Sequence, residues 1–273
     1  MRSIILPWST SMSKCSISRT LIIVLLLASW ALVQGPLMAQ SLWLGARGGL
    51  SIPDLRGGNS EQTQGYSSRL GPDFGAFLRK EISTSFAVQI ELLYASQGGK
   101  KDGMQLIPDG SLPDGTVPPG TALYANYQNE TIMNYLEVPV LARYTFNFAD
   151  GRGPIKLYVE GGPYIGFLLN AKTETSGTSS IYLDKLGTPL ALPPLGTLLP
   201  PVDFTASTPV TSDIKTINAG ITGGLGVSTS LGPGSVILDA RVTYGLTDVQ
   251  RDPTNGKNNT GSFVIAIGYE IPI

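Results

Sequence analysis

Ten charged side chains fall on the polar face of the predicted strands, and these are the residues of the chain best suited to chemistry. Four are arginines and six are carboxylates: Arg47, Asp73, Arg79, Glu91, Glu137, Arg143, Glu160, Asp239, Arg241 and Glu270. Glu91, Glu137 and Glu160 could serve a hydrolase, which needs two carboxyl groups at a suitable separation with divergent pKa values. Arginines in the same layer would instead hold these carboxylates ionised. We therefore predict no catalytic residue and a structural charge network formed by Arg47, Glu91, Glu137, Arg143, Glu160, Asp239 and Arg241.

Other side chains for catalysis or metal binding are scarce. The chain has no histidine, and its one cysteine, Cys15, precedes the apolar run of residues 21–33. If that run is removed as part of a signal peptide, no thiol nucleophile, disulfide or Cys/His metal site is left. We predict neither a metal site nor a cofactor. Lys+Arg total 19 against 20 for Asp+Glu, without the clustered basic residues that nucleic acid requires, so nucleic acid is not a predicted partner.

The strands that carry these charges are predicted from alternation. In residues 135–146 one face is apolar, and it consists of Leu136, Val138, Val140, Ala142, Tyr144 and Phe146. A period of two is typical of a strand. Residues 150–154 interrupt the pattern with glycine and proline, and alternation resumes at Ile155. Residues 135–169 therefore predict a hairpin of two long strands.

Similar alternation predicts six more strands, in residues 41–50, 70–80, 84–97, 213–231, 235–249 and from 261 to the end. The connections between the eight strands alternate in length. Long or medium ones are predicted at residues 53–69, 98–131, 173–212 and 250–260, and short turns at 81–83, 150–154 and 232–234. Short periplasmic turns and long outer loops are typical of an antiparallel, up-and-down transmembrane β-barrel. The all-β alternative is a soluble periplasmic barrel that binds lipid, in which the apolar face would point inward.

The first forty residues indicate export. Arg2, Lys14 and Arg19 precede the apolar run at 21–33, which is shorter than the ~20 residues of a transmembrane helix. We predict a signal peptide at residues 1–39 and a barrel domain at 40–273, with a retained anchor helix as the alternative. The predicted location is the bacterial outer membrane.

Aromatic side chains on the apolar face support the membrane interpretation. They fall near the two ends of the predicted strands, as the interfacial girdles of outer-membrane barrels do. The residues of the predicted girdles are Phe74, Phe86, Tyr94, Tyr144, Phe146, Tyr244, Phe263 and Tyr269.

Two further segments bear on function. The glycine-rich residues 220–226 lack the following helix of a phosphate-binding loop, so we interpret the glycines as allowing strands to bend. Residues 190–202 are unusually apolar for a surface loop and rich in proline, which suits either a docking segment or a self-packed lid.

Five segments together resemble the PorT-like outer-membrane β-barrel family of the Bacteroidota: GARGGLSIPDL, FAVQIELLYASQGGK, NYLEVPVLARYTF, LYVEGGPYIGFLL and LDARVTYGLTDV. The resemblance implies an eight-stranded outer-membrane barrel. Eight strands leave an interior that side chains fill, so we predict a closed, salt-bridged lumen and a structural, surface-interaction or envelope-assembly role. The alternatives are a narrow porin-like channel and an accessory factor in protein secretion. Predicted partners are outer-membrane lipid, the outer-membrane assembly machinery, and a surface or secretion partner bound by the long loops.

Overall fold

The computed structural model describes residues 41–58, 60–61, 63–107, 117–118, 121–146, 155–192, 196–252 and 256–273. The predicted signal peptide and the predicted turn at 150–154 lie outside these ranges. Within them, no helix is long and apolar enough to cross a membrane.

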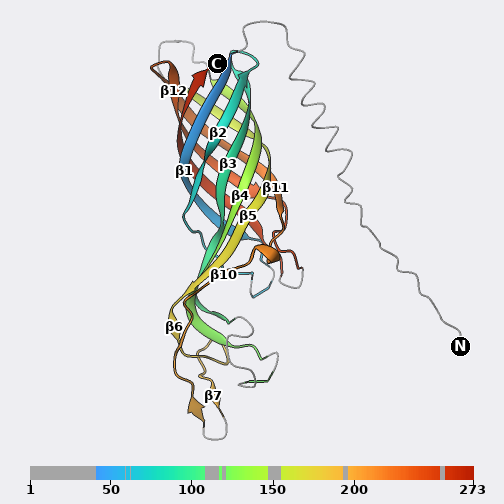
Figure 1. Cartoon of the computed structure of the whole chain (residues 1–273), viewed down its shortest axis with the longest axis vertical. Coiled ribbons are helices and arrows are strands. Elements are labelled where there is room, and N and C mark those ends of the chain that lie inside the picture. The colour runs from blue at the N-terminus through green and yellow to red at the C-terminus, as the bar shows by residue number, and fades with distance from the viewer. Residues whose placement is uncertain are drawn as a thin grey trace, which may run out of the picture. The chain divides into compact units, whose positions relative to one another are not determined.

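Eight long antiparallel strands form a closed barrel (Figure 1). Each strand pairs with the next along the chain, and the last pairs with the first. The predicted eight-stranded up-and-down barrel is therefore confirmed. The strands are β1 (Leu42–Arg56), β2 (Gly71–Glu81), β3 (Phe86–Leu106), β4 (Tyr124–Phe146), β5 (Ile155–Ser176), β11 (Ile217–Leu231), β12 (Gly234–Gly245) and β13 (Asn259–Pro272).

The barrel is apolar outside and polar inside. On β2, for example, Phe74 and Leu78 are exposed, whereas Asp73 and Arg79 are buried. The same alternation runs along the other barrel strands, because successive side chains of a strand point to opposite faces of the sheet. A soluble barrel would show the reverse arrangement, so the exposed apolar band indicates contact with lipid.

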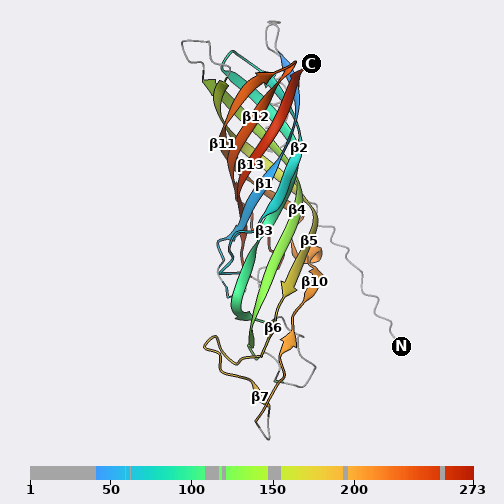
Figure 2. The same ribbon diagram turned by 90° about the vertical axis from the view of Figure 1, so that its left-hand side faces the viewer.

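Three strands continue well beyond the barrel (Figure 2). The outer parts of β3, β4 and β5, together with β6–β10, form what we call the extension. β10 (Ala206–Pro209) pairs with the edge of β5, and two small ribbons join β6 (Thr178–Ser179) to β9 (Val202–Asp203) and β7 (Ala191–Leu192) to β8 (Thr197–Leu198). A short 3-10 helix, η1 (Thr211–Asp213), leads back to the barrel.

The predicted loops at 98–131 and 173–212 are therefore partly wrong. β3 runs to Leu106, β4 begins at Tyr124 and β5 runs to Ser176. The predicted loop at 53–69 is also too long, because β1 extends to Arg56. In the other direction, residues 246–249 and 213–216 lie outside the strands predicted for them.

Apolar residues of the long loops pack against one another. Leu123, Ile181 and Leu190 are buried together, and Ile107, Val117, Leu199, Val202 and Phe204 pack against them. Of residues 190–202, Leu190, Leu199 and Val202 thus contribute to a small hydrophobic core of the extension, whereas Leu198 is 60% exposed. Self-packing therefore accounts for part of this segment, and a docking role for its exposed part stays a prediction.

The junction between barrel and extension has a chemical boundary and two backbone irregularities. On the outer face of β4, apolar Leu136 and Val138 give way to Asn134, whose side chain donates to that of Asn170 on β5 at 2.9 Å. The β4–β5 register shifts by one residue at this point, and on β3 the nearby Gly98 has a φ of +125°. A bulge bends a strand and re-aims its side chains. The lipid-facing band therefore ends here on these three strands.

Gly98 offers a direct test of this junction. A Cβ at this position would lie 2.0 Å from the carbonyl oxygen of Thr131, and the positive φ disfavours any L side chain. We expect Gly98→Ala to lower the free energy of unfolding by at least about 1–3 kcal/mol. Urea unfolding of the refolded protein in vesicles measures this loss.

Gly103→Ala is the matched control for Gly98→Ala. Gly103 lies on the same strand with a φ of +105°, but nothing lies within 4 Å of the place that a Cβ would take there. The control therefore carries the cost of the backbone conformation without the steric clash. Equal losses for the two variants would contradict the importance of the close approach at Gly98.

Candidate functional site

The charged side chains predicted to form the network all lie inside the barrel. Arg47, Glu91, Glu137, Arg143, Glu160, Asp239 and Arg241 are each buried, as are Asp73, Arg79 and Glu270. They come from seven different strands, and alternation explains why each points inward. They do not form one continuous network, however, but separate into groups along the barrel.

Arg241 is the centre of the largest group, which we call the inner network. Its guanidinium contacts Glu91 at 2.7 and 2.9 Å and Glu160 at 2.5 Å, and it reaches Asp239 at 3.4 Å. Arg47 binds the opposite side of the group, 3.4 Å from Glu91 and 3.4 Å from Asp73. Two guanidinium groups thus hold four carboxylates. Charge-assisted pairs of this kind offset the cost of burying the ions only when the contacts are numerous and well aligned.

A second group lies at the short-turn end of the barrel. Arg79 makes a bidentate contact with Glu270, at 3.0 and 2.8 Å, and also binds Glu81 at 3.0 Å. The Arg79 guanidinium stacks on the ring of Trp43 at 4.9 Å. This group fastens β13 to β2 across β1.

Two of the predicted network residues have no ion pair among the described residues. Arg143 lies 3.3 Å from the ring centroid of Tyr158, and its other contact is a 3.5 Å hydrogen bond to Gln89. Glu137 accepts a hydrogen bond from Gln97 at 3.1 Å. Arg143 is therefore joined to the inner network through Gln89 and Tyr158 and not by an ion pair, whereas Glu137 lies in the interior apart from that network.

Some interior residues were not predicted. The phenol of Tyr158 donates to Asp239, and Gln89 donates to Glu91 at 2.5 Å. Both occupy polar-face positions of the alternation, so the same pattern that placed the charges also carried the signal for them. The carboxylates are held by arginine, amide and phenol groups. In the described residues no group of three or more His, Cys, Asp or Glu is placed to hold a metal.

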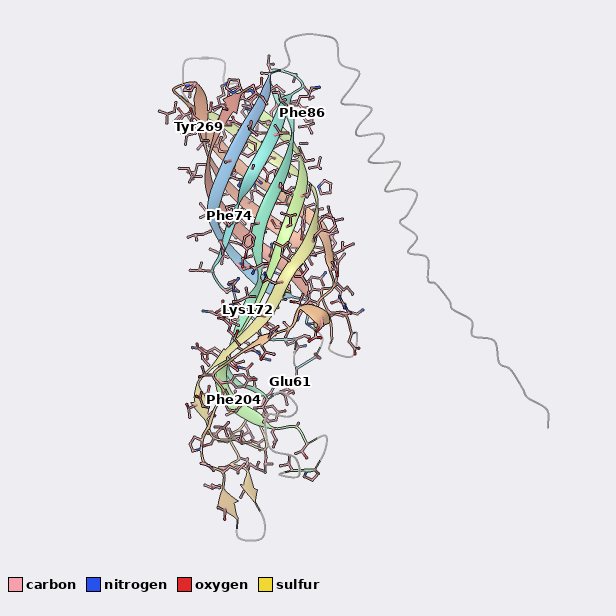
Figure 3. All side chains as sticks on the ribbon, viewed as in Figure 1. Glu61, Phe74, Phe86, Lys172, Phe204 and Tyr269 are labelled. Carbon is pink, nitrogen blue, oxygen red and sulfur yellow. The ribbon has the colours of Figure 1, made fainter. Side chains whose placement is uncertain are left out.

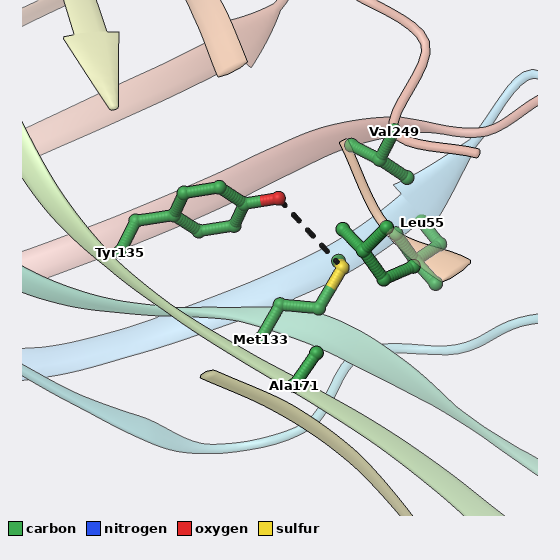
Figure 4. Packing of buried hydrophobic residues seen from close by; sticks show 6 residues of the cluster. Leu55, Met133, Tyr135, Ala171 and Val249 are labelled. Carbon is green, nitrogen blue, oxygen red and sulfur yellow. Dashed lines mark hydrogen bonds between the residues drawn. The ribbon is translucent and has the colours of Figure 1, made fainter. Parts of the chain in front are cut away.

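An apolar cluster lies at the long-loop end of the barrel, where Figure 4 shows its side chains meeting. We call it the mouth cluster, and its buried members are Leu55, Met133, Tyr135, Ala171, Ile214 and Val249. Met133 and Tyr135 are both completely buried, and the Tyr135 hydroxyl reaches the Met133 sulfur at 3.9 Å. The cluster combines strand residues with Ile214 and Val249 from the loops before β11 and after β12.

The predicted girdle residues all point outward or lie at the surface. Seven are exposed, and Tyr94, which is half-buried, stacks on Phe74 at 5.1 Å. Phe86 and Tyr269 lie at the short-turn end in Figure 3, and Phe74 lies further toward the extension. Tyr144 and Phe146 meet edge to face at 5.2 Å near the end of β4. Aromatic side chains at both limits of an apolar band match the two interfaces of a bilayer.

A closed eight-stranded barrel with a lipid-facing apolar band and an ion-paired interior is an outer-membrane β-barrel. The model of the family described as "Outer membrane protein beta-barrel domain" matches residues 38–251, and the chain belongs to this family. Its location is the bacterial outer membrane, as predicted. No match was found among curated proteins.

Solved structures similar to this chain include the following three, of which OprG is described as an outer-membrane protein. Neisserial surface protein A is 12% identical, covers 85% of this chain and 97% of its own, and has a TM-score of 0.39. Ail, the attachment invasion locus protein of Yersinia pestis, is 12% identical, with coverages of 84% and 98% and a TM-score of 0.35. OprG from Pseudomonas aeruginosa is 10% identical, with coverages of 85% and 97% and a TM-score of 0.37.

Proposed function

We propose that this protein is a closed outer-membrane barrel that carries a folded recognition unit on the cell surface. The extension is that unit, because barrels of this type place their short turns in the periplasm and their long loops outside. Its strands, ribbons and hydrophobic core hold it in a defined shape. Function tends to lie in such exposed connections, which a rigid scaffold positions.

The observation that carries this proposal is that two groups of buried contacts lie one behind the other in the barrel interior. The inner network fills the middle of the lumen with paired charges, and the mouth cluster covers the long-loop end with apolar side chains. An ion crossing the barrel would have to break buried salt bridges and then pass a dry apolar layer, and both steps are costly. A surface-interaction role therefore fits the interior better than a narrow channel does.

Single-channel recording tests the closed barrel. We expect the refolded wild-type protein to give no discrete openings in a planar bilayer, with a porin in the same bilayer as positive control. Insertion is verified by the heat-dependent gel shift of the folded protein. Discrete, reproducible openings of the inserted protein would overturn the closed-lumen proposal and favour the narrow channel.

The affiliation with PorT-like proteins of the Bacteroidota stays a prediction from sequence, as does an accessory role in secretion. Both are compatible with a surface unit that binds a partner. Neither is needed for the proposed closed barrel, which the interior contacts support.

A further inference from the structure

A cavity of about 700 Å³ opens above the mouth cluster, between the extension and the rim of the barrel. We call it the mouth cavity. Its size falls within the ~300–1,000 Å³ typical of small-molecule sites. One wall is the inner face of β4 and β5, a second is the returning segment 202–210, and the loops that contain Tyr66 and Gln250 complete it.

The walls of the mouth cavity are held in place by contacts of their own. The ring of Phe204 stacks on Tyr127 at 4.9 Å, its amide donates to the carbonyl oxygen of Gly177 at 2.8 Å, and its carbonyl accepts from Thr175 at 2.5 Å. The Tyr127 hydroxyl donates to the carbonyl of Leu106 at 2.8 Å. The cavity is therefore built before any ligand arrives, which reduces the entropic cost of binding.

The lining is amphipathic. The floor consists of Leu55, Met133, Ile214 and Val249, which form the outward side of the mouth cluster. Threonines dominate the walls, and each offers a methyl group beside a hydroxyl: Thr63, Thr131, Thr173, Thr175, Thr205 and Thr208. Such a surface suits a ligand with an apolar body and scattered polar groups.

The charges around the mouth cavity argue against an anion. Its described lining residues include no lysine or arginine, and the two carboxylates, Asp203 and Asp213, are exposed at its rim. Burial raises the pKa of Tyr127 to about 12 and also raises the pKa of Tyr66, so both phenols are neutral at neutral pH. A neighbouring groove of about 540 Å³ contrasts with this, since Lys100, Lys101, Asp102, Glu130 and Glu174 line it.

Asn129 supplies the polar feature that indicates a ligand. It lies on the inner face of β4, in a wall that the mouth cavity shares with the neighbouring charged groove, and its side-chain oxygen is buried without a hydrogen-bond partner in the described structure. A buried acceptor left unpaired is costly, so a donor brought by a ligand would be favourable here once the Asn129 side chain turns its oxygen into the cavity.

We propose that the mouth cavity binds uncharged molecules that join an apolar ring to hydroxyl groups, with a ligand hydroxyl donating to Oδ1 of Asn129. The apolar floor receives the ring, and the threonine and asparagine side chains meet the hydroxyls. This site rests on the proposed recognition role of the extension and gives it a chemical class of ligand.

Phenyl β-glucoside is a suitable probe, because it is uncharged and water-soluble and combines both features. Saturation-transfer NMR with the full mature chain in lipid nanodiscs measures its binding, with empty nanodiscs as blank. We expect binding of phenyl glucoside, and binding at least about tenfold weaker for glucose, which lacks the ring, and for phenyl phosphate, which is anionic. Asn129→Leu, which removes the acceptor, is expected to weaken phenyl glucoside binding by about tenfold.

Gln128→Leu is the matched control for Asn129→Leu. It makes a similar change one residue away on β4, at a position that lines the charged groove and not the mouth cavity. Thr173→Phe fills the cavity from β5 and is expected to abolish binding. This second variant tests the site if Asn129→Leu does not fold, as judged by the heat-dependent gel shift. Absence of phenyl glucoside binding, or equal loss in Gln128→Leu, would overturn the ligand site. The single-channel recording tests the closed barrel independently of this experiment. A failure of the ligand site and a failure of the closed barrel can therefore be distinguished.

Discussion

Arg241→Ala is expected to lower the free energy of unfolding by about 3–5 kcal/mol, because it removes one member of a buried ion-pair group and leaves its partners unpaired. Arg241 contacts Glu91, Glu160 and Asp239 and is almost completely buried. Without it, Arg47 is the one guanidinium left in the inner network, and it approaches Asp239 at 4.0 Å. Three buried carboxylates would then lack their main counter-charge.

Urea unfolding in lipid vesicles measures this loss, with Trp43 as reporter because it is the single tryptophan of residues 41–273. Arg56→Ala is the control, since the Arg56 side chain is 52% exposed, compared with 4% for Arg241, and approaches Asp54 at 3.7 Å. An exposed pair of this kind contributes about 0–1 kcal/mol. A loss below about 1 kcal/mol for Arg241→Ala would contradict the inner network as a source of stability.

A second substitution separates the lost ion pairs from the lost packing of the Arg241 side chain. Glu91→Gln in the Arg241→Ala background removes one of the carboxylates that the first change leaves unpaired. The loss for the double variant should therefore be smaller than the sum of the two single losses. Additive losses would show that packing, and not charge pairing, accounts for the effect.

Within the membrane the sequence carried enough information to place side chains. Residues that face lipid must be apolar and residues that face the packed interior are polar, so a period of two persists for the length of the barrel strands. Arg241 and Glu91 lie 150 positions apart, yet local alternation predicts that both side chains point into the barrel. Which carboxylate pairs with which arginine could not, because strand register and depth decide it.

The extension escaped prediction for a physical reason. Along the membrane part of β4 the lipid-facing apolar residues are even-numbered, as at Leu136 and Val138, whereas beyond Asn134 the buried apolar residues are odd-numbered, as at Tyr127 and Met133, with Ile132 an apolar exception on the other face. Water replaces lipid on the outer face beyond Asn134, so the polar and apolar faces exchange along one continuous strand. Alternation of apolar residues is interrupted at this exchange, so the pattern predicts that the strand ends there. The glycines of β3 also favour the prediction of a loop.

The mouth cluster and the mouth cavity lie beyond what alternation can predict. Ile214 and Val249 come from connections, and the extension positions Asn129 and Phe204 around the cavity. None of these residues belongs to a recognisable sequence motif. These residues come together only because β3, β4 and β5 continue beyond the barrel, and alternation in the sequence does not predict that continuation.

Leu225→Arg is expected to destabilise the barrel by about 2–4 kcal/mol, whereas Leu231→Arg should cost about 0–1 kcal/mol. Both leucines lie on the outer face of β11 and have nearly equal exposure, 56% and 59%. Leu225 is in the middle of the strand, between Val159 and Ala240, and Leu231 is at its end beside the turn at Gly232. Six residues of a tilted strand change the depth by about 15 Å, which takes the arginine from the bilayer centre to the interface.

The two variants form their own control, because residue type, strand and exposure are matched and depth alone differs. The free energy of unfolding of each is measured in the same vesicles, and a detergent-solubilised series removes the bilayer while keeping the fold. The difference between the variants should shrink in detergent, since a micelle lets the guanidinium reach water from either position. Equal losses in vesicles would mean that Leu225 does not face the hydrocarbon core. The exposed apolar band would then need a covering other than lipid.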